Sequence, residues 1–260
     1  MNFYSLSDKG MIRPNNKDYT ESFQWRWCGI DGTTESFTAL LLADGMGGAA
    51  AGEFASSLAI KTVKEKLQAG LLSSKPEVIL AADLREMLIA CCVEANDAIY
   101  KKAQENPEME GMGTTIVIAI ICRDMLTLCH VGDSRCYMLR EGRLKQLTHD
   151  HSLVQEMIDA GKITPDQAEK HPNKNIITRA LGVAPSVQPD CSRLPIFTGD
   201  VLVLGTDGLC GFVNDRTIKD MAEKQASQPN ANLKKFAQSL IECANLNGGA
   251  DNISVSLYRH

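Results

Sequence analysis

Residues 37–48 read Phe37-Thr38-Ala39-Leu40-Leu41-Leu42-Ala43-Asp44-Gly45-Met46-Gly47-Gly48, and the rest of this sequence can be interpreted around them. They join an apolar run of strand length to an acid and a glycine-rich turn. Apolar runs of this length that end in glycine are typical of buried strands. Asp44 therefore lies at the C-terminal end of a predicted strand, and the glycine after it lets a ligand approach the backbone.

The same design recurs near the C-terminus. Residues 201–208, Val-Leu-Val-Leu-Gly-Thr-Asp-Gly, place Asp207 after another predicted strand, and Asp251 comes just before the strand-like run 253–258. An Asp-Gly pair on its own is commonly only a tight turn. Three acids at strand ends can nevertheless converge on one point, where their carboxylates repel unless cations neutralise them.

Carboxylate oxygens are hard ligands that select Mg²⁺ or Mn²⁺, whereas thiolates would select zinc. Two such ions need a bridging carboxylate, and Asp44 is the best candidate. Ions about 3.5–4 Å apart can hold a hydroxide between them and polarise a phosphoryl oxygen. Arg13 is available to complement the remaining phosphate oxygens. The pattern therefore predicts hydrolysis of a phosphate ester.

The order of the predicted elements indicates an α+β fold. Residues 114–147 form consecutive short strands with tight turns, which is typical of an antiparallel meander. Helical patterns occur in two pairs, at 49–67 and 77–104 and again at 215–225 and 232–245. We therefore expect two sheets packed face to face, with a helical layer on each outer side. The N-terminal residues 5–22 are polar and are interpreted as a loop.

Composition excludes several classes of protein. The net charge of -5 argues against a general nucleic-acid binder. No apolar run has the roughly 18 residues of a membrane span, and the N-terminus shows no secretory pattern, so we expect a cytoplasmic protein. Nine scattered cysteines indicate a reducing cytosol and thiols that are mostly buried and inert. Residues 149–151, His-Asp-His, invite a zinc interpretation that we do not adopt, because neighbours on a loop need share no ligand.

Eight short motifs follow one another along essentially the whole chain. They are Arg13-x-x-Asn16-x-Asp18, Asp44-Gly45-Met46-Gly47-Gly48, Gly113-Thr114-Thr115, Val131-Gly132-Asp133-Ser134-Arg135, Leu147-Thr148-x-Asp150-His151-Ser152, Ile177-Thr178-Arg179-Ala180-Leu181-Gly182, Thr206-Asp207-Gly208 and Asp251-Asn252-Ile253. In this order the sequence resembles the metal-dependent protein serine/threonine phosphatases of the PP2C or PPM family, in their compact bacterial form. The resemblance implies a four-layer α-β-β-α sandwich formed by one domain, residues 1–260. It also implies that the polar segment 148–182 is a flap beside the active-site cleft.

The resemblance assigns metal ligands residue by residue. It implies that Asp44 bridges two metals, that the carbonyl of Gly45 binds one, and that Asp207 and Asp251 bind the other. Asp133 corresponds to the acid that helps to hold a third, weaker metal in bacterial members. The implied cofactors are two or three Mn²⁺ or Mg²⁺ ions per chain.

Other residues are implied to support this centre. Arg13 corresponds to the arginine that contacts phosphate, Asp18 to an acid in the outer shell of the metals, and Asn252 to a residue that orients the site. Lys17 departs from the family, which usually has glutamate there to engage metal-bound water. The lysine removes a negative charge and is expected to weaken one metal, or to contact phosphate itself.

The sequence therefore predicts a phosphatase that removes phosphate from phosphoserine and phosphothreonine in proteins, as a monomer, opposing a serine/threonine kinase. Attack by a hydroxide between the metals would need no phosphoenzyme. Two alternatives remain open: a catalytically weakened phosphoprotein-binding module, which Lys17 alone supports, and a phosphomonoesterase for small molecules. A serine hydrolase is excluded because the sequence has no Gly-x-Ser-x-Gly elbow.

Overall fold

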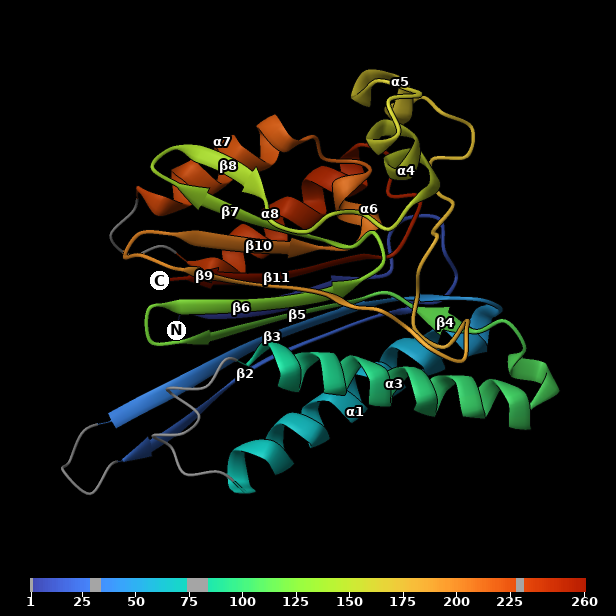
Figure 1. The fold of residues 1–260 in the computed structure, drawn as a ribbon. Coiled ribbons are helices and arrows are strands. Elements are labelled where there is room, and N and C mark those ends of the chain that lie inside the picture. The colour runs from blue at the N-terminus through green and yellow to red at the C-terminus, as the bar shows by residue number, and fades with distance from the viewer. Residues whose placement is uncertain (1, 29–33, 74–83, 228–231) are drawn as a thin grey trace.

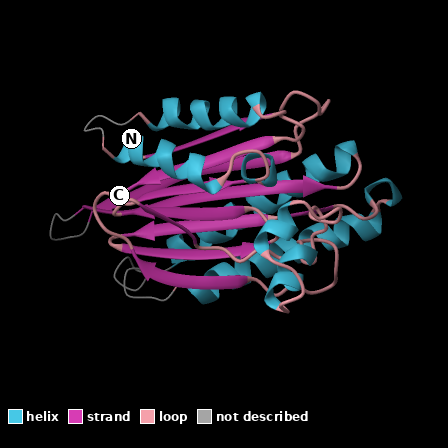
Figure 2. Ribbon diagram, turned by 90° about the horizontal axis from the view of Figure 1, so that it is seen from above, coloured by secondary structure: helices cyan, strands magenta, loops and turns pink. Residues whose placement is uncertain are grey.

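The computed structural model describes residues 2–28, 34–73, 84–227 and 232–260. Two β-sheets lie face to face in the middle of the molecule, and helices cover the outer face of each (Figures 1 and 2). This arrangement confirms the predicted α+β sandwich of four layers.

Each sheet is antiparallel between the neighbours for which strand pairs are defined. The first sheet has the order β1 (Phe3–Asp8), β11 (Ile253–Arg259), β10 (Val201–Gly205), β7 (Arg135–Arg140) and β8 (Arg143–Gln146). The second has the order β2 (Asp18–Cys28), β3 (Thr34–Met46), β5 (Ile116–Cys122), β6 (Met125–Val131) and β9 (Asp190–Pro195), and the short β4 (Gly113–Thr114) pairs with the end of β3.

The helices are divided between the two outer faces. The second sheet is covered by α1 (Ala49–Ser73) and α3 (Arg85–Glu105), with the short η1 (Pro107–Met109) after them (Figure 1). The first sheet is covered by α6 (Asp207–Cys210), α7 (Asp215–Ala226) and α8 (Leu233–Leu246). Two further helices, α4 (Leu153–Asp159) and α5 (Pro165–Glu169), stand together at one end of the sandwich, in the segment predicted as an insertion.

Residues 37–46 lie in β3, an interior strand of the second sheet between β2 and β5, and both faces of this strand are buried. Ala39 and Leu41 belong to the apolar core beneath α1 and α3, and Leu40 and Leu42 belong to the core between the two sheets. Side chains alternate between the faces of a strand, so a strand buried on both sides has a continuous apolar run. Burial of this strand fixes where Asp44 emerges.

Two predictions about the strands were wrong. The polar N-terminal segment is not a loop throughout, because it contains β1 and the start of β2. Its serines are accommodated by pairing, with Ser5 Oγ 2.7 Å from Ser256 Oγ and Ser7 Oγ 2.7 Å from Ser254 Oγ. The strands of 114–147 do not form one meander either. β6 and β7 belong to different sheets, so the turn at 132–134 crosses from one sheet to the other.

One pair of cysteines departs from the free thiols expected in a reducing compartment. Cys129 of β6 and Cys191 of β9 face each other in register and form a disulfide. Neighbouring antiparallel strands bring facing residues close enough for this bond. The buried thiols Cys91, Cys92 and Cys136 are free, as the sequence indicated.

Two remaining observations concern the extent of the described chain. The Asp31-Gly32 pair, whose sequence is typical of a hairpin turn, lies outside the described residues. Among the helices that the structure does describe, none combines the length and the apolar character needed to cross a bilayer.

Candidate active site

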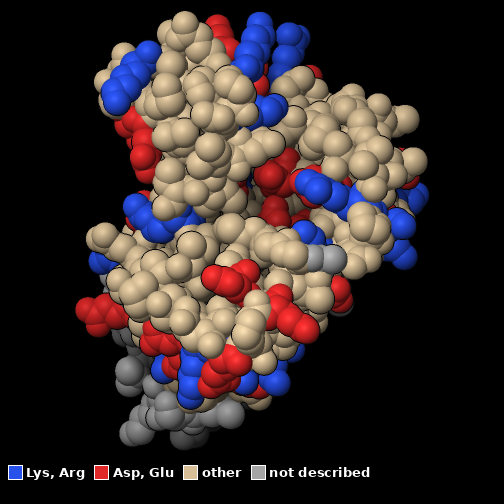
Figure 3. Space-filling view, turned by 90° about the vertical axis from the view of Figure 1, so that its right-hand side faces the viewer, with Lys and Arg blue, Asp and Glu red and all other residues tan. Residues whose placement is uncertain are grey.

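Acids from both sheets meet at one end of the sandwich. Asp44, near the end of β3, pairs in register with Asp18 at the start of β2. Asp207 is the first residue of α6, directly after β10, and Asp251 comes just before β11. Asp133 lies in the turn that joins the sheets. In Figure 3 acidic side chains gather in a hollow of this face, with basic side chains beside them.

These carboxyl groups raise one another's pKa values. Burial raises the pKa of Asp44 well above its usual value, and the negative charges of Asp18, Asp207 and Asp133 raise it further. The pKa of Asp207 is raised by burial and then by the charge of Asp251. Burial and the Asp207 charge raise the pKa of Asp18 and of Asp133 to about 7. The five carboxyl groups therefore form one interacting cluster, whose shared negative charge favours a cation.

The donor set fits a hard divalent cation. Oδ1 of Asp18, of Asp133 and of Asp207 is buried and has no hydrogen-bond partner. Buried polar atoms are normally paired, so these oxygens are available as ligands, and oxygen is what Mg²⁺ and Mn²⁺ prefer. The backbone beside Asp44 is packed closely against the first turn of α1. A Cβ on Gly45 would come 2.0 Å from the carbonyl oxygen of Gly52, which explains the glycine at this position.

Arg13 lies at the edge of the cluster. Its Nε and Nη2 donate to the two carboxylate oxygens of Asp251 at 2.9 and 2.7 Å. That contact raises the pKa of Arg13 first, and the charges of Asp207 and Asp44 also contribute. The guanidinium is about half exposed, so it remains able to meet a ligand from solvent.

Asn252 holds the loop that carries Arg13. Its Oδ1 accepts the N–H of Lys17 at 2.8 Å, and its Nδ2 donates to the carbonyls of Lys9 and Asn15 at 2.9 and 2.8 Å. One side chain at the start of β11 thus fixes three points of the chain between β1 and β2. Its contacts are with the backbone of this loop, not with the carboxylates of the cluster.

The Lys17 side chain is turned toward the glycine-rich turn after Asp44. Its Nζ donates to the carbonyl oxygen of Gly47 at 2.8 Å. Its own carbonyl accepts the N–H of Gly45 at 3.2 Å and the hydroxyl of Ser56 at 2.6 Å. Lys17 therefore braces the turn from both its backbone and its side chain.

Sequence reasoning gave no role to three hydroxyl groups that support the acids. Thr206 Oγ1 donates to Asp18 Oδ2 at 2.9 Å and accepts the N–H of Ser254 at 3.0 Å. Thr115 Oγ1 accepts the N–H of Asp44 at 3.0 Å and lies 2.8 Å from Ser134 Oγ. Thr206 and Ser134 each stand directly beside a motif acid, which was the available signal.

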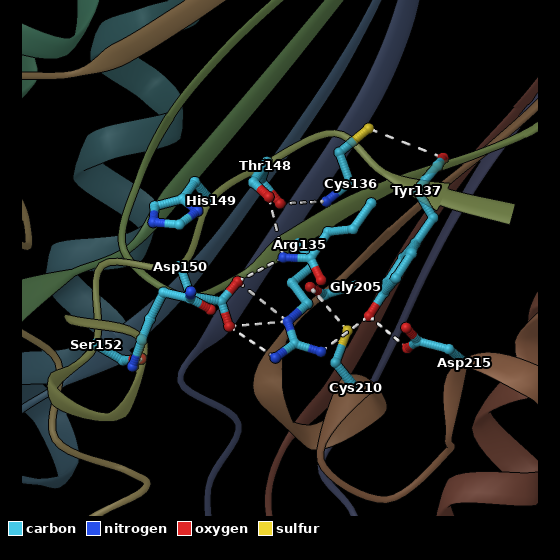
Figure 4. A network of polar contacts seen from close by, with 12 residues as sticks. Arg135, Cys136, Tyr137, Thr148, His149, Asp150, Ser152, Gly205, Cys210 and Asp215 are labelled. Carbon is cyan, nitrogen blue, oxygen red and sulfur yellow. Dashed lines mark hydrogen bonds and ion pairs between the residues drawn. The ribbon is translucent and has the colours of Figure 1, made fainter. Parts of the chain in front are cut away.

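The side chains at 149–151 turn to separate partners. Asp150 pairs with Arg135 (Figure 4). His149 Nε2 lies 2.7 Å from Asp159, and His151 Nδ1 accepts the N–H of Gly132. His151 instead gathers with His130 and Asp190, whose candidate ligand atoms lie within 4.8 Å of one another. Arg179 Nη1 approaches Asp190 Oδ1 to 2.8 Å and His151 Nε2 to 3.0 Å, so a guanidinium already occupies this cluster.

A family model described as protein phosphatase 2C matches residues 24–245. The chain belongs to the protein phosphatase 2C family. Its relatives include a serine/threonine phosphatase of Listeria welshimeri, which is 35% identical over 96% of this chain and 92% of its own length.

Solved structures show the same relationship. The serine/threonine phosphatase of S. agalactiae superposes with a TM-score of 0.82 at 34% identity, over 99% of both chains. The catalytic domain of the protein phosphatase PstP, in complex with two manganese ions, superposes with a TM-score of 0.78 at 35% identity, over 99% of this chain and 96% of the other. In this PP2C-family chain the acidic cluster is therefore the candidate metal centre.

Proposed function

We propose that this chain is a metal-dependent phosphatase that hydrolyses phosphoserine and phosphothreonine in proteins. The observation that carries the proposal is the convergence of carboxylates from both sheets, three of which have buried oxygens without a partner. Membership of the protein phosphatase 2C family supports the same activity.

Each residue of the cluster is given a role in this proposal. Asp44 would hold two Mn²⁺ or Mg²⁺ ions with the Gly45 carbonyl, Asp207 and Asp251, and Asp133 would help to hold a third. When bound, these ions supply an activated water and stabilise the charge that develops on the phosphoryl group. Asp18 stands behind them, fixed by its hydrogen bond from Thr206.

Arg13 would bind the phosphate of the substrate. Its guanidinium is half exposed and already placed at the cluster by Asp251, so two of its N–H groups can face a phosphate oxygen pair. Asn252 and Lys17 would hold the loop and the glycine-rich turn on either side of this position.

The open approach to the cluster favours a protein substrate over a small phosphorylated molecule. A cavity of about 420 Å³ lies between Met46 and residues 177–188, and none of the five acids lines it. The acids are instead reached from an open hollow of the surface (Figure 3). A phosphorylated side chain that projects from a protein segment suits such a site better than a free metabolite, which is usually enclosed.

We further propose that residues 1–260 form one phosphatase domain, with 148–182 as a flap beside the hollow. The protein would act as a cytoplasmic monomer that opposes a serine/threonine kinase. Light scattering after gel filtration would test the monomer, and a dimeric mass would contradict it.

The decisive experiment is hydrolysis of a phosphothreonine peptide with and without Mn²⁺. We expect activity that requires the metal and disappears in Asp207→Asn. Asp124→Asn is the matched control, because Asp124 is exposed in the hairpin between β5 and β6. Absence of activity in the wild type at millimolar Mn²⁺ would contradict the enzyme and favour the binding module. Equal activity in Asp207→Asn would contradict the assigned site.

A further inference from the structure

The turn that carries Asp133 is gripped at both ends by residues at the beginning of the flap. We call residues 132–135 the Asp133 turn and residues 148–152 the flap root. The two segments are joined through side chains that the proposed chemistry does not use. Their contacts are hydrogen bonds from Gly132 and Arg135, the first and last residues of the turn.

His151 holds the first end of the Asp133 turn. Its Nδ1 accepts the N–H of Gly132 at 3.0 Å, and its own backbone N–H donates to the carbonyl of Gly132 at 3.0 Å. Only 4% of the residue is exposed. Because Nδ1 accepts, the proton of the neutral ring is on Nε2, which lies 3.3 Å from Asp190 Oδ2.

Asp150 holds the other end. Its carboxylate accepts from Nε and Nη2 of Arg135 at 2.9 and 2.7 Å, and from Nε2 of Gln146 at 2.8 Å (Figure 4). Thr148 adds a third contact just beyond the turn, since its Oγ1 accepts the N–H of Cys136 at 3.1 Å. Consecutive residues of the flap root, Asp150 and His151, thus contact the two ends of the turn.

The position of the Asp133 carboxylate depends closely on the backbone of its turn. Oδ1 of Asp133 is buried and has no hydrogen-bond partner. Gly132 has a φ of +109°, and a Cβ there would come 2.5 Å from Thr115 Cγ2. The backbone therefore runs against Thr115 in a conformation that other residues rarely adopt, and a small shift of the turn would move the carboxylate directly.

We propose that Asp150 and His151 are positioning residues that fix the Asp133 carboxylate through the two ends of its turn. The importance of this clamp for metal binding rests on the proposed role of Asp133. The clamp itself is a property of the hydrogen bonds and can be measured without metal.

Two substitutions of His151 separate the clamp from general packing. In His151→Asn the amide oxygen replaces Nδ1, so the Gly132 N–H keeps an acceptor. In His151→Gln the polar atoms reach the Nε2 position instead, and Gly132 loses its partner. His149→Asn is the matched control, because His149 is exposed and turned toward Asp159.

The first readout is the hydrogen-exchange rate of the Gly132 amide in metal-free protein, followed by NMR. We expect exchange to accelerate about tenfold or more in His151→Gln, as for loss of a buried hydrogen bond, and to stay near the wild-type rate in His151→Asn and in the control. The proposal would be overturned if the Gly132 amide exchanged at the same rate in His151→Gln and His151→Asn, or if its exchange accelerated in both variants.

The second readout is Mn²⁺ binding by calorimetry, with Asp133→Asn as the reference. We expect His151→Gln and Asp150→Asn to weaken the same binding step that Asp133→Asn removes, while His151→Asn keeps it. If Asp133→Asn leaves Mn²⁺ binding unchanged, the assigned role of Asp133 fails, and the exchange rates still decide whether the clamp exists. If Asp133→Asn removes a Mn²⁺-binding step that His151→Gln and Asp150→Asn both retain, the positioning role is overturned.

Discussion

The hydroxyl oxygen of Ser134 lies 2.8 Å from that of Thr115, and this contact joins the two acidic turns of the site. Thr115 Oγ1 accepts the N–H of Asp44, which leaves its proton for Ser134. Ser134 follows Asp133 directly in the chain. The positions of Asp44 and Asp133 are therefore linked through two buried hydroxyl groups.

Thr115→Val should destabilise the protein by about 1–3 kcal/mol, because it leaves the Asp44 N–H and the Ser134 hydroxyl without a partner at nearly constant volume. Urea unfolding measures the loss. Thr38→Val is the control, since Thr38 is equally buried on β3 but accepts only from the part-buried Gln24. An equal loss in the two variants would contradict the link.

Arg13→Ala should raise KM for a phosphothreonine peptide roughly tenfold or more, since a charge-assisted contact to phosphate is lost. Mn²⁺ binding by calorimetry should not weaken, because removing the cation leaves Asp251 free to face the metal. Arg26→Ala, an exposed arginine that bonds Gln24, is the control. A weakened Mn²⁺ affinity with unchanged KM would show that Arg13 organises the metal site and does not bind phosphate.

Lys17→Glu should tighten Mn²⁺ binding several-fold. Reversing a charge beside the cluster changes its electrostatic interaction with a bound cation by on the order of 1 kcal/mol at a solvated surface. Lys17→Met should lie between the two, since it removes the positive charge and the bond to Gly47 without adding a negative one. Calorimetric titration with Mn²⁺ measures the order. An unchanged affinity in Lys17→Glu would count against an effect of Lys17 on the metals.

Acid should destabilise the wild type more than His151→Asn. Burial lowers the pKa of His151 to about 4. Asp190 raises this pKa and His130 and Arg179 lower it, each by less than burial does. Between pH 6.5 and 4 the unfolded chain then binds more protons at this residue, so the free energy of unfolding falls as pH falls. The variant should lose about 1–2 kcal/mol less than the wild type between pH 7.5 and 5. Urea unfolding at both pH values measures these losses. An equal decrease in the free energy of unfolding of the wild type and of His151→Asn would refute the prediction.

Cys191→Ser should lower the free energy of unfolding by about 2–4 kcal/mol in the absence of reductant, because the Cys129–Cys191 bond closes a long loop. Cys243→Ser, which changes a half-buried free thiol, should be nearly neutral. With a dithiol reductant the wild type and Cys191→Ser should become equal. A peptide map without reductant that lacks the bridged fragment would contradict the bond.

Strong local patterns predicted the architecture well. The apolar run within 37–48 forms a strand that is buried on both faces. The first residues of α7 and α8 lie within one residue of the predicted helix starts. Weak patterns misled where tertiary pairing decided the outcome. β1 is polar enough to be interpreted as a loop, and only the facing serines of β11 accommodate its hydroxyl groups.

The fold class and the acids at strand ends could be predicted from the amino-acid order, because the periodicity of burial and the short motifs are encoded within a few residues. The tertiary structure decided the contacts between distant segments. These include the crossing of the Asp133 turn between the sheets, the bond from Lys17 to Gly47, the hydroxyl link from Thr115 to Ser134, and the grip of the flap root. Such contacts depend on which buried polar groups come within about 3 Å after folding, and no local pattern along the chain specifies that distance.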